Sequence, residues 1–107
     1  MHATFASLCF LVSAVAAPPL VEQQDLWVGG TDGYHTYRIP SIIVTKSGTV
    51  LAFCEGRKTA GGDHGDLDLL MKRSTDGGRT WSAQSIVYEE GDTAKITIGN
   101  PCPVVDQ

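Results

Sequence analysis

Positive charge is sparse in this sequence of 107 residues and is nowhere clustered. There are 8 Lys and Arg residues against 12 Asp and Glu residues, which gives a formal net charge of −4. Proteins that bind nucleic acid or anionic lipid through charge carry runs or patches of Lys and Arg. The sequence therefore predicts neither kind of partner, and an anionic ligand would need a local cationic pocket.

Cysteine is scarce as well, which excludes a disulfide scaffold. Of the three cysteines, Cys9 lies in the apolar N-terminal stretch, so Cys54 and Cys102 are the two that remain for a mature chain. Cys54 directly follows the apolar residues 51–53. We expect it to be a small buried hydrophobe, with a disulfide as the alternative.

A long apolar run is missing apart from the N-terminus, where residues 3–17 contain no charged residue. That run is too short to span a bilayer, and the small residues Ala14–Ala17 before Pro18 offer a cleavage site. We predict a signal peptide at residues 1–17, and hence a secreted or otherwise extracytoplasmic protein, lysosomal or periplasmic locations included. A buried N-terminal strand or helix is the alternative.

No stretch of helical periodicity follows, and short apolar runs alternate with Gly, Asp, Ser and Thr. We expect a connecting segment at 18–36 and one all-β domain at 37–107. A Gly-containing connection at 46–49 predicts a hairpin. Successive apolar residues indicate strands that are covered on both faces. The four strands of one antiparallel meander are predicted at Ser41–Thr45, Val50–Glu55, Leu67–Arg73 and Ser85–Tyr88.

Strand direction then sorts the polar residues into two groups. Arg38 before the first strand, Arg57 after the second and Asp63 in the following loop should share one end of the meander. The turn at 75–79 falls at the opposite end, because the third strand runs away for roughly 25 Å at about 3.3 Å per residue. The fourth strand returns, so Asn100 becomes a further candidate for the first end.

The turn Ser74-Thr75-Asp76-Gly77-Gly78-Arg79-Thr80-Trp81 resembles the Asp box, the S-x-D-x-G-x-T-W turn of sialidase-type propellers. Ser and Asp side chains can bond turn amides, Gly supplies positive φ, and Trp can pack beneath the turn. The resemblance implies a structural role for Ser74, Asp76, Gly78, Thr80 and Trp81. Noncatalytic propellers also carry this turn, so alone it says little about activity.

Tyr37-Arg38-Ile39-Pro40 resembles the F/Y-R-I-P motif of the sialidase family. The resemblance implies that Arg38 is one of three arginines that grip the carboxylate of sialic acid, a task that suits the planar guanidinium fork. Glu55-Gly56-Arg57 followed by Asp63 resembles the next family element. It implies that Arg57 lines the sugar pocket and that Asp63 is the general acid and base, a carboxyl held among apolar neighbours.

Asn100-Pro101-Cys102-Pro103 resembles the element that opens the second blade in part of the family, and implies that Asn100 faces the sugar. Other members have Asp there, and a polar cap before a Pro-rich strand is the alternative. Together the resemblances cover 37–106. They imply a six-bladed β-propeller of which this sequence holds the first blade and the start of the second.

The resemblance implies an exo-α-sialidase, a glycoside hydrolase that removes terminal sialic acid from glycoproteins, glycolipids or oligosaccharides without metal or cofactor. The family uses a Tyr nucleophile paired with Glu. Tyr34, Tyr37 and Tyr88 occur too early to match it, and two further arginines would lie beyond Gln107, so we expect these 107 residues alone to be inactive.

Three alternatives remain. A noncatalytic propeller could bind sialylated glycans or a protein partner through the same end of the sheet, and a purely structural Asp-box protein would have no sugar site. Asp63, Asp66 and Asp68 with His64 could instead form an acidic metal loop, although their spacing does not match an EF-hand. The sequence does not predict the oligomeric state.

Overall fold

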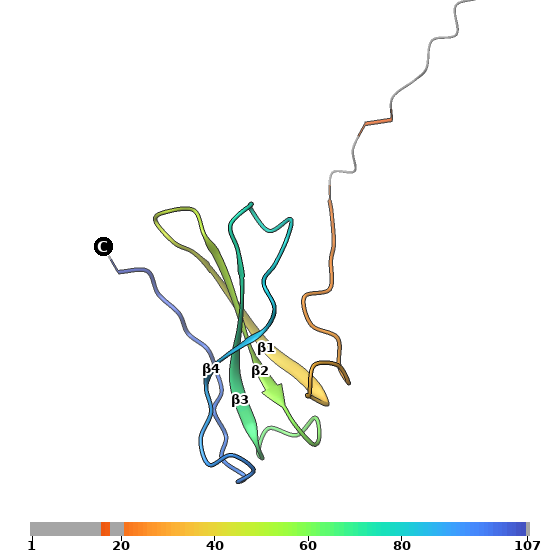
Figure 1. Ribbon diagram of the computed structural model, residues 1–107, viewed down its shortest axis with the longest axis vertical. Helices are drawn as coiled ribbons and strands as arrows, with labels where there is room; N and C mark the ends of the chain where they lie inside the picture. Colours follow the sequence, from red (N-terminus) through yellow and green to blue (C-terminus); the bar gives the residue numbers. More distant parts are fainter. Residues whose placement is uncertain (1–15, 18–20, 107) are drawn as a thin grey trace, which may run out of the picture.

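A computed structural model describes residues 16–17 and 21–106 of the chain. These residues form one antiparallel sheet whose four strands lie side by side in chain order (Figure 1). The strands are β1 (Thr36–Val44), β2 (Val50–Arg57), β3 (Leu67–Ser74) and β4 (Ser85–Tyr88). The predicted all-β meander is therefore confirmed. Most of the predicted signal peptide, residues 1–15, lies outside the described residues.

The two arginines lie inside strands, not beside them as predicted. Arg38 belongs to β1 and pairs with Glu55, while Arg57 is the last residue of β2 and pairs with Thr36. The strands run further than their apolar residues because backbone pairing continues through the polar positions. The prediction that both arginines share one end of the hairpin is nevertheless confirmed.

The hairpin connection between β1 and β2 is the predicted one. Gly48 has φ of 82°, in the left-handed region that glycine adopts without a steric cost. Its amide donates to the Thr45 carbonyl at 2.9 Å, and the Thr45 amide donates to the Thr49 carbonyl at 2.8 Å. The turn thus fixes the register of the two strands.

A β-bulge interrupts β1 directly after Arg38. Arg38 pairs with Glu55 and Ser41 pairs with Phe53, so β1 uses one residue more than β2 over this interval. Within it, Ile39 has φ of 54°, which is rare for a β-branched residue. Bulges of this kind turn side chains relative to the sheet. Here the bulge sets the direction of the strand next to the predicted carboxylate-binding arginine.

The core lies between the sheet and the segment that leads into β1. Tyr34, Cys54 and Leu70 are buried together, and Trp27 and Tyr37 pack against them. The rings of Tyr34 and Tyr37 lie 5.7 Å apart between centroids. Burial raises the pKa of the Cys54 thiol to about 12, and the thiol is free, as expected for a small buried hydrophobe.

Elsewhere the sheet leaves apolar side chains in contact with solvent. Ile42 and Val44 of β1 are exposed, as are all of the apolar residues of β4. The expected cover on both faces is thus not supplied within the described part of the chain. A meander with one covered face is consistent with a propeller blade, whose neighbours supply the other contacts. The described residues include no helix with the length and apolar character needed to cross a membrane.

The Asp box closes the connection from β3 to β4, at the end of the sheet away from Arg57. Asp76 Oδ1 accepts from the Ser74 hydroxyl at 2.8 Å and from the Thr80 amide at 2.9 Å. The Ser74 hydroxyl accepts from the Gly78 amide at 2.9 Å, and the indole of Trp81 donates to the Gly78 carbonyl at 3.0 Å. These hydrogen bonds hold the pKa of Asp76 well below its ordinary value.

Gly56 is the position in β2 where the packing tolerates no side chain. A Cβ there would overlap Leu70 and would lie 2.7 Å from the ring of Tyr34. We expect Gly56→Ala to lower the free energy of unfolding by about 1–3 kcal/mol, the usual cost of overpacking. Urea unfolding would measure it. Gly62→Ala, where a Cβ meets nothing within 4 Å, is the control, and equal stability of both variants would contradict this account.

Candidate functional site

The three residues predicted to share one end of the sheet lie together there, with Asp63 in contact with both arginines. Asp63 Oδ1 accepts from Arg38 Nη1 at 3.0 Å and from Arg57 Nη1 at 2.8 Å. Arg38 comes from β1, Arg57 from the end of β2, and Asp63 from the loop between β2 and β3. The antiparallel pairing of β1 with β2 brings the two arginines to the same end, as the strand directions predicted.

Arg57 is the buried member of this cluster, with 2% of its side chain exposed. Its Nη1 also donates to the carbonyls of Gly61 and Gly62, at 2.7 and 2.8 Å. Backbone carbonyls and a carboxylate together satisfy this edge of the guanidinium. The loop that carries Asp63 therefore wraps around Arg57.

Glu55 holds the other edge of the same guanidinium. Its Oε2 accepts from Arg57 Nη2 at 2.7 Å and from Arg57 Nε at 3.1 Å. The sequence motifs gave Glu55 no role, although its position two residues before Arg57 indicates a contact between the two side chains. In a strand, residues two positions apart point to the same face, so a carboxylate two residues before an arginine is placed to pair with it.

Asn100 reaches this end of the sheet through its backbone. Its amide donates to Glu55 Oε1 at 2.9 Å, which confirms the predicted return of the chain. Asn100 has φ of 53°, a conformation that Asn tolerates better than most residues. The Asn100 backbone is thus fixed by a carboxylate that also holds Arg57.

The surroundings of Asp63 differ from the expected apolar setting. Its side chain is 73% exposed, and its hydrogen bond with Arg57, the charge of Arg57 and the charge of Arg38 hold its pKa below the ordinary value. Opposite charges within a few ångströms favour the ionised form. In this chain Asp63 is therefore a carboxylate paired with two cations, and the expectation of apolar neighbours is wrong.

Asp66 at the end of this loop and Asp68 in β3 belong to a separate ion-pair network. Lys58 contacts Asp66 at 3.0 Å and Asp68 at 3.3 Å, and Asp68 accepts from the Tyr34 hydroxyl at 2.5 Å. The pKa of Tyr34 is raised, mainly by burial of the hydroxyl and secondly by its hydrogen bond to Asp68. No group of three or more His, Cys, Asp or Glu side chains among the described residues could hold a metal ion.

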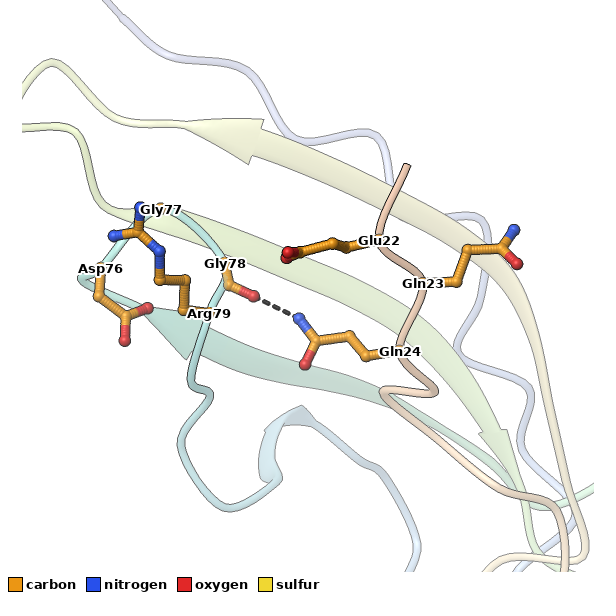
Figure 2. A pocket seen from close by; sticks show the side chains of 7 residues that line it. All are labelled: Glu22, Gln23, Gln24, Asp76, Gly77, Gly78 and Arg79. Atoms are coloured by element: carbon orange, nitrogen blue, oxygen red, sulfur yellow. Dashed lines mark hydrogen bonds between the residues drawn. The ribbon is translucent and has the colours of Figure 1, made fainter. Parts of the chain in front are cut away.

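A groove of about 760 Å³ lies at the opposite end, beside the Asp box. Figure 2 shows Glu22 and Gln24 of the lead-in segment facing the turn, with the Gln24 amide donating to the Gly78 carbonyl. The groove is lined by Glu22, Gln23, Gln24, Asp76, Gly77, Gly78 and Arg79. It is open and lies at the far end from Arg38, Arg57 and Asp63, so it is not part of the candidate site.

The two arginines should differ in their influence on Asp63. We expect Arg57→Ala to raise the pKa of Asp63 more than Arg38→Ala does, because Arg57 makes the dominant hydrogen bond. Carbon-13 NMR of the carboxyl would measure both shifts, with Arg79→Ala as the control. A larger shift in Arg38→Ala would contradict this order.

The sign of the linked stability follows from the lowered pKa. Because Asp63 is more acidic in the folded state, its pairing stabilises the fold above the ordinary carboxyl pKa of about 4. That stabilisation is lost as the pH falls through the lowered value. Arg57→Ala should therefore reduce the acid sensitivity of unfolding that arises from Asp63.

The sequence of this chain is similar to those of several curated sialidases. No family model matches the chain. It is 43% identical to a sialidase of Micromonospora viridifaciens over 83% of this chain and 14% of that protein. It is 40% identical to an exo-alpha-sialidase of Arthroderma benhamiae over 69% of this chain and 19% of that protein. It is 32% identical to sialidase-2 of Cricetulus griseus over 87% of this chain and 24% of that protein.

The chain thus spans between 14% and 24% of the length of these curated relatives. They are bacterial, fungal and mammalian, and the matches extend over most of the 107 residues. The same residues that resemble sialidase motifs form the contacts between Arg38, Arg57 and Asp63. The chain belongs to the sialidase family.

Proposed function

We propose that the protein carrying this segment is an exo-α-sialidase that removes terminal sialic acid from glycoproteins, glycolipids or oligosaccharides. The observation that carries the proposal is the contact of Asp63 with both Arg38 and Arg57 at one end of the sheet. Sequence similarity to proteins named sialidase or exo-alpha-sialidase supports the proposal. In this proposal the four strands are one blade of a six-bladed propeller, and residues 1–17 direct the protein out of the cytoplasm.

Arg38 is suited to receive the substrate. About half of its side chain is exposed, at 49%, whereas Arg57 is buried. A guanidinium offers parallel N–H groups that match the two oxygens of a carboxylate, and sialic acid carries its carboxylate at the reacting carbon. Arg38 would therefore bind the substrate carboxylate. Arg57 and Asn100 would line the pocket that holds the sugar.

Asp63 would act as the general acid and base. In the free chain its paired arginines favour the carboxylate form. A substrate carboxylate that binds Arg38 would offset the positive charge of that arginine beside Asp63, which raises the pKa of Asp63. Substrate binding would thus promote the protonated form that can protonate the leaving oxygen.

In this proposal none of the three tyrosines is the nucleophile. The Tyr34 hydroxyl donates to Asp68 at 2.5 Å, the Tyr37 hydroxyl donates to the Thr31 carbonyl at 2.8 Å, and Tyr88 contacts Glu90 at 3.4 Å. All three occur too early in the sequence to match the nucleophile of the family, so the proposal places the Tyr–Glu nucleophile pair on blades contributed by other parts of the protein. It requires no metal and no cofactor.

The 107-residue chain alone should release no reporter from a fluorogenic sialoside, because the acid at Asp63 has no nucleophile opposite it. Fluorescence of the purified chain at micromolar concentration would test this, with a full-length sialidase as the positive control. Turnover above the buffer rate would contradict the assignment of the nucleophile to another part of the protein.

In a full-length protein, Asp63→Asn should lower kcat by about 10²–10⁴-fold with little change in KM, since proton transfer contributes that range. Arg38→Ala should lower kcat/KM strongly, because a charge-assisted contact to the substrate is lost. Steady-state kinetics with an aryl sialoside would measure both, and Arg79→Ala at the far end of the sheet is the control. Near-normal kinetics in both site variants would refute these roles. Retained sialoside binding without turnover in the wild type would favour a noncatalytic glycan-binding propeller.

A further inference from the structure

We propose that Glu55 is a positioning residue of this site, which holds Arg57 against the Asp63 loop and ties the chain at Asn100 to the same point. The proposal deepens the function proposed above and rests on it for its catalytic consequence. Its structural part stands on the contacts of one buried carboxylate. Glu55 is 4% exposed, and both of its oxygens accept hydrogen bonds.

The first contact determines how Arg57 is oriented. Glu55 Oε2 accepts from Nε and Nη2, so the remaining terminal nitrogen, Nη1, faces Asp63 and the carbonyls of Gly61 and Gly62. Without the carboxylate, the Nε and Nη2 donors would be buried and unsatisfied. The guanidinium would then turn to recover partners, and its contact with Asp63 would be lost or weakened.

The second contact places the segment that follows β4. Glu55 Oε1 accepts from the Asn100 amide at 2.9 Å. The preceding residue, Gly99, approaches the same carboxylate so closely that a Cβ would overlap Oε1 and would lie 3.0 Å from the carboxyl carbon. Glycine is therefore required for this approach, and the position of Glu55 and that of Asn100 are set together.

One carboxylate thus joins three segments: the end of β2, the loop that carries Asp63, and the chain at 99–100. A residue that served the fold alone would affect stability without changing the acidity of Asp63. Loss of a residue that positions Arg57 would raise the pKa of Asp63. Removing the negative charge of Glu55 can by itself only lower the pKa of Asp63, whereas moving Arg57 away from Asp63 raises it. The direction of the shift separates the two roles.

Glu55→Gln is the first variant, to be made in the full-length protein. An amide has one oxygen and no charge, so the contact that its NH₂ group faces, with the Arg57 donors or with the Asn100 backbone amide, must break, and the other contact is weakened. We expect the carboxyl-carbon NMR titration to show a raised pKa for Asp63, whose resonance is identified by its loss in Asp63→Asn. We also expect amide exchange at Asn100 to accelerate about tenfold or more, as for loss of one hydrogen bond.

Gly99→Ala is the second variant, and it changes no charge. The added methyl group would displace the Glu55 carboxylate from the side of Asn100. We expect the pKa of Asp63 to rise here as well, and kcat/KM for an aryl sialoside to fall about 10–100-fold in both variants, as is common for residues that orient a functional group. Glu90→Gln, which removes an exposed carboxylate of the same type, is the matched control.

The readouts keep this inference separate from the proposed function. An inactive wild-type protein would overturn the sialidase proposal, while the titration and the amide exchange would still test Glu55. A pKa of Asp63 that is unchanged or lowered in both variants would overturn the positioning role. If Glu55→Gln fails to fold, the same titration in Gly99→Ala decides the matter by the same criterion.

Discussion

The ion pair between Arg57 and Glu55 is the interaction on which the candidate site depends. Both side chains are almost fully buried at the end of β2, so each charge requires the other. Arg57 then has one edge left, and that edge organises the loop of Asp63. The remaining oxygen of Glu55 fixes the chain at Asn100. A single buried pair thereby connects parts of the sequence that lie 45 residues apart.

The structural turn and the candidate functional residues lie at opposite ends of the sheet. At one end, the Asp76 carboxylate is engaged with Ser74 and Thr80 and stabilises a turn. At the other, Asp63 is mostly exposed, and the cations beside it lie at different depths. A carboxylate that already accepts several local hydrogen bonds has little capacity to bind a ligand. The exposed Arg38, in contrast, can release Asp63 and bind the anionic group of a ligand instead. The Asp63 end therefore carries the functional proposal.

Backbone strain is concentrated close to this end. Ile39 has φ of 54° directly after Arg38, in a bulge that also involves Pro40, which cannot donate a ladder hydrogen bond. A β-branched residue adopts this conformation only when its surroundings enforce it. Tyr37, two residues before Ile39 in β1, packs against the core together with Trp27 of the segment that leads into β1.

The number and order of the strands, the hairpin at Gly48 and the separation of the Asp box from Arg38, Arg57 and Asp63 were determined by the sequence alone. They follow from alternating apolar runs and from the reversal of direction at each turn, which are local properties. The tertiary structure decided what depends on burial: that Tyr34 joins the core, that Asp63 is paired with cations and not with apolar groups, and that Glu55 joins Arg57 to Asn100. Those outcomes could not be read from the sequence, because the depth of each charge is set by residues distant along the chain.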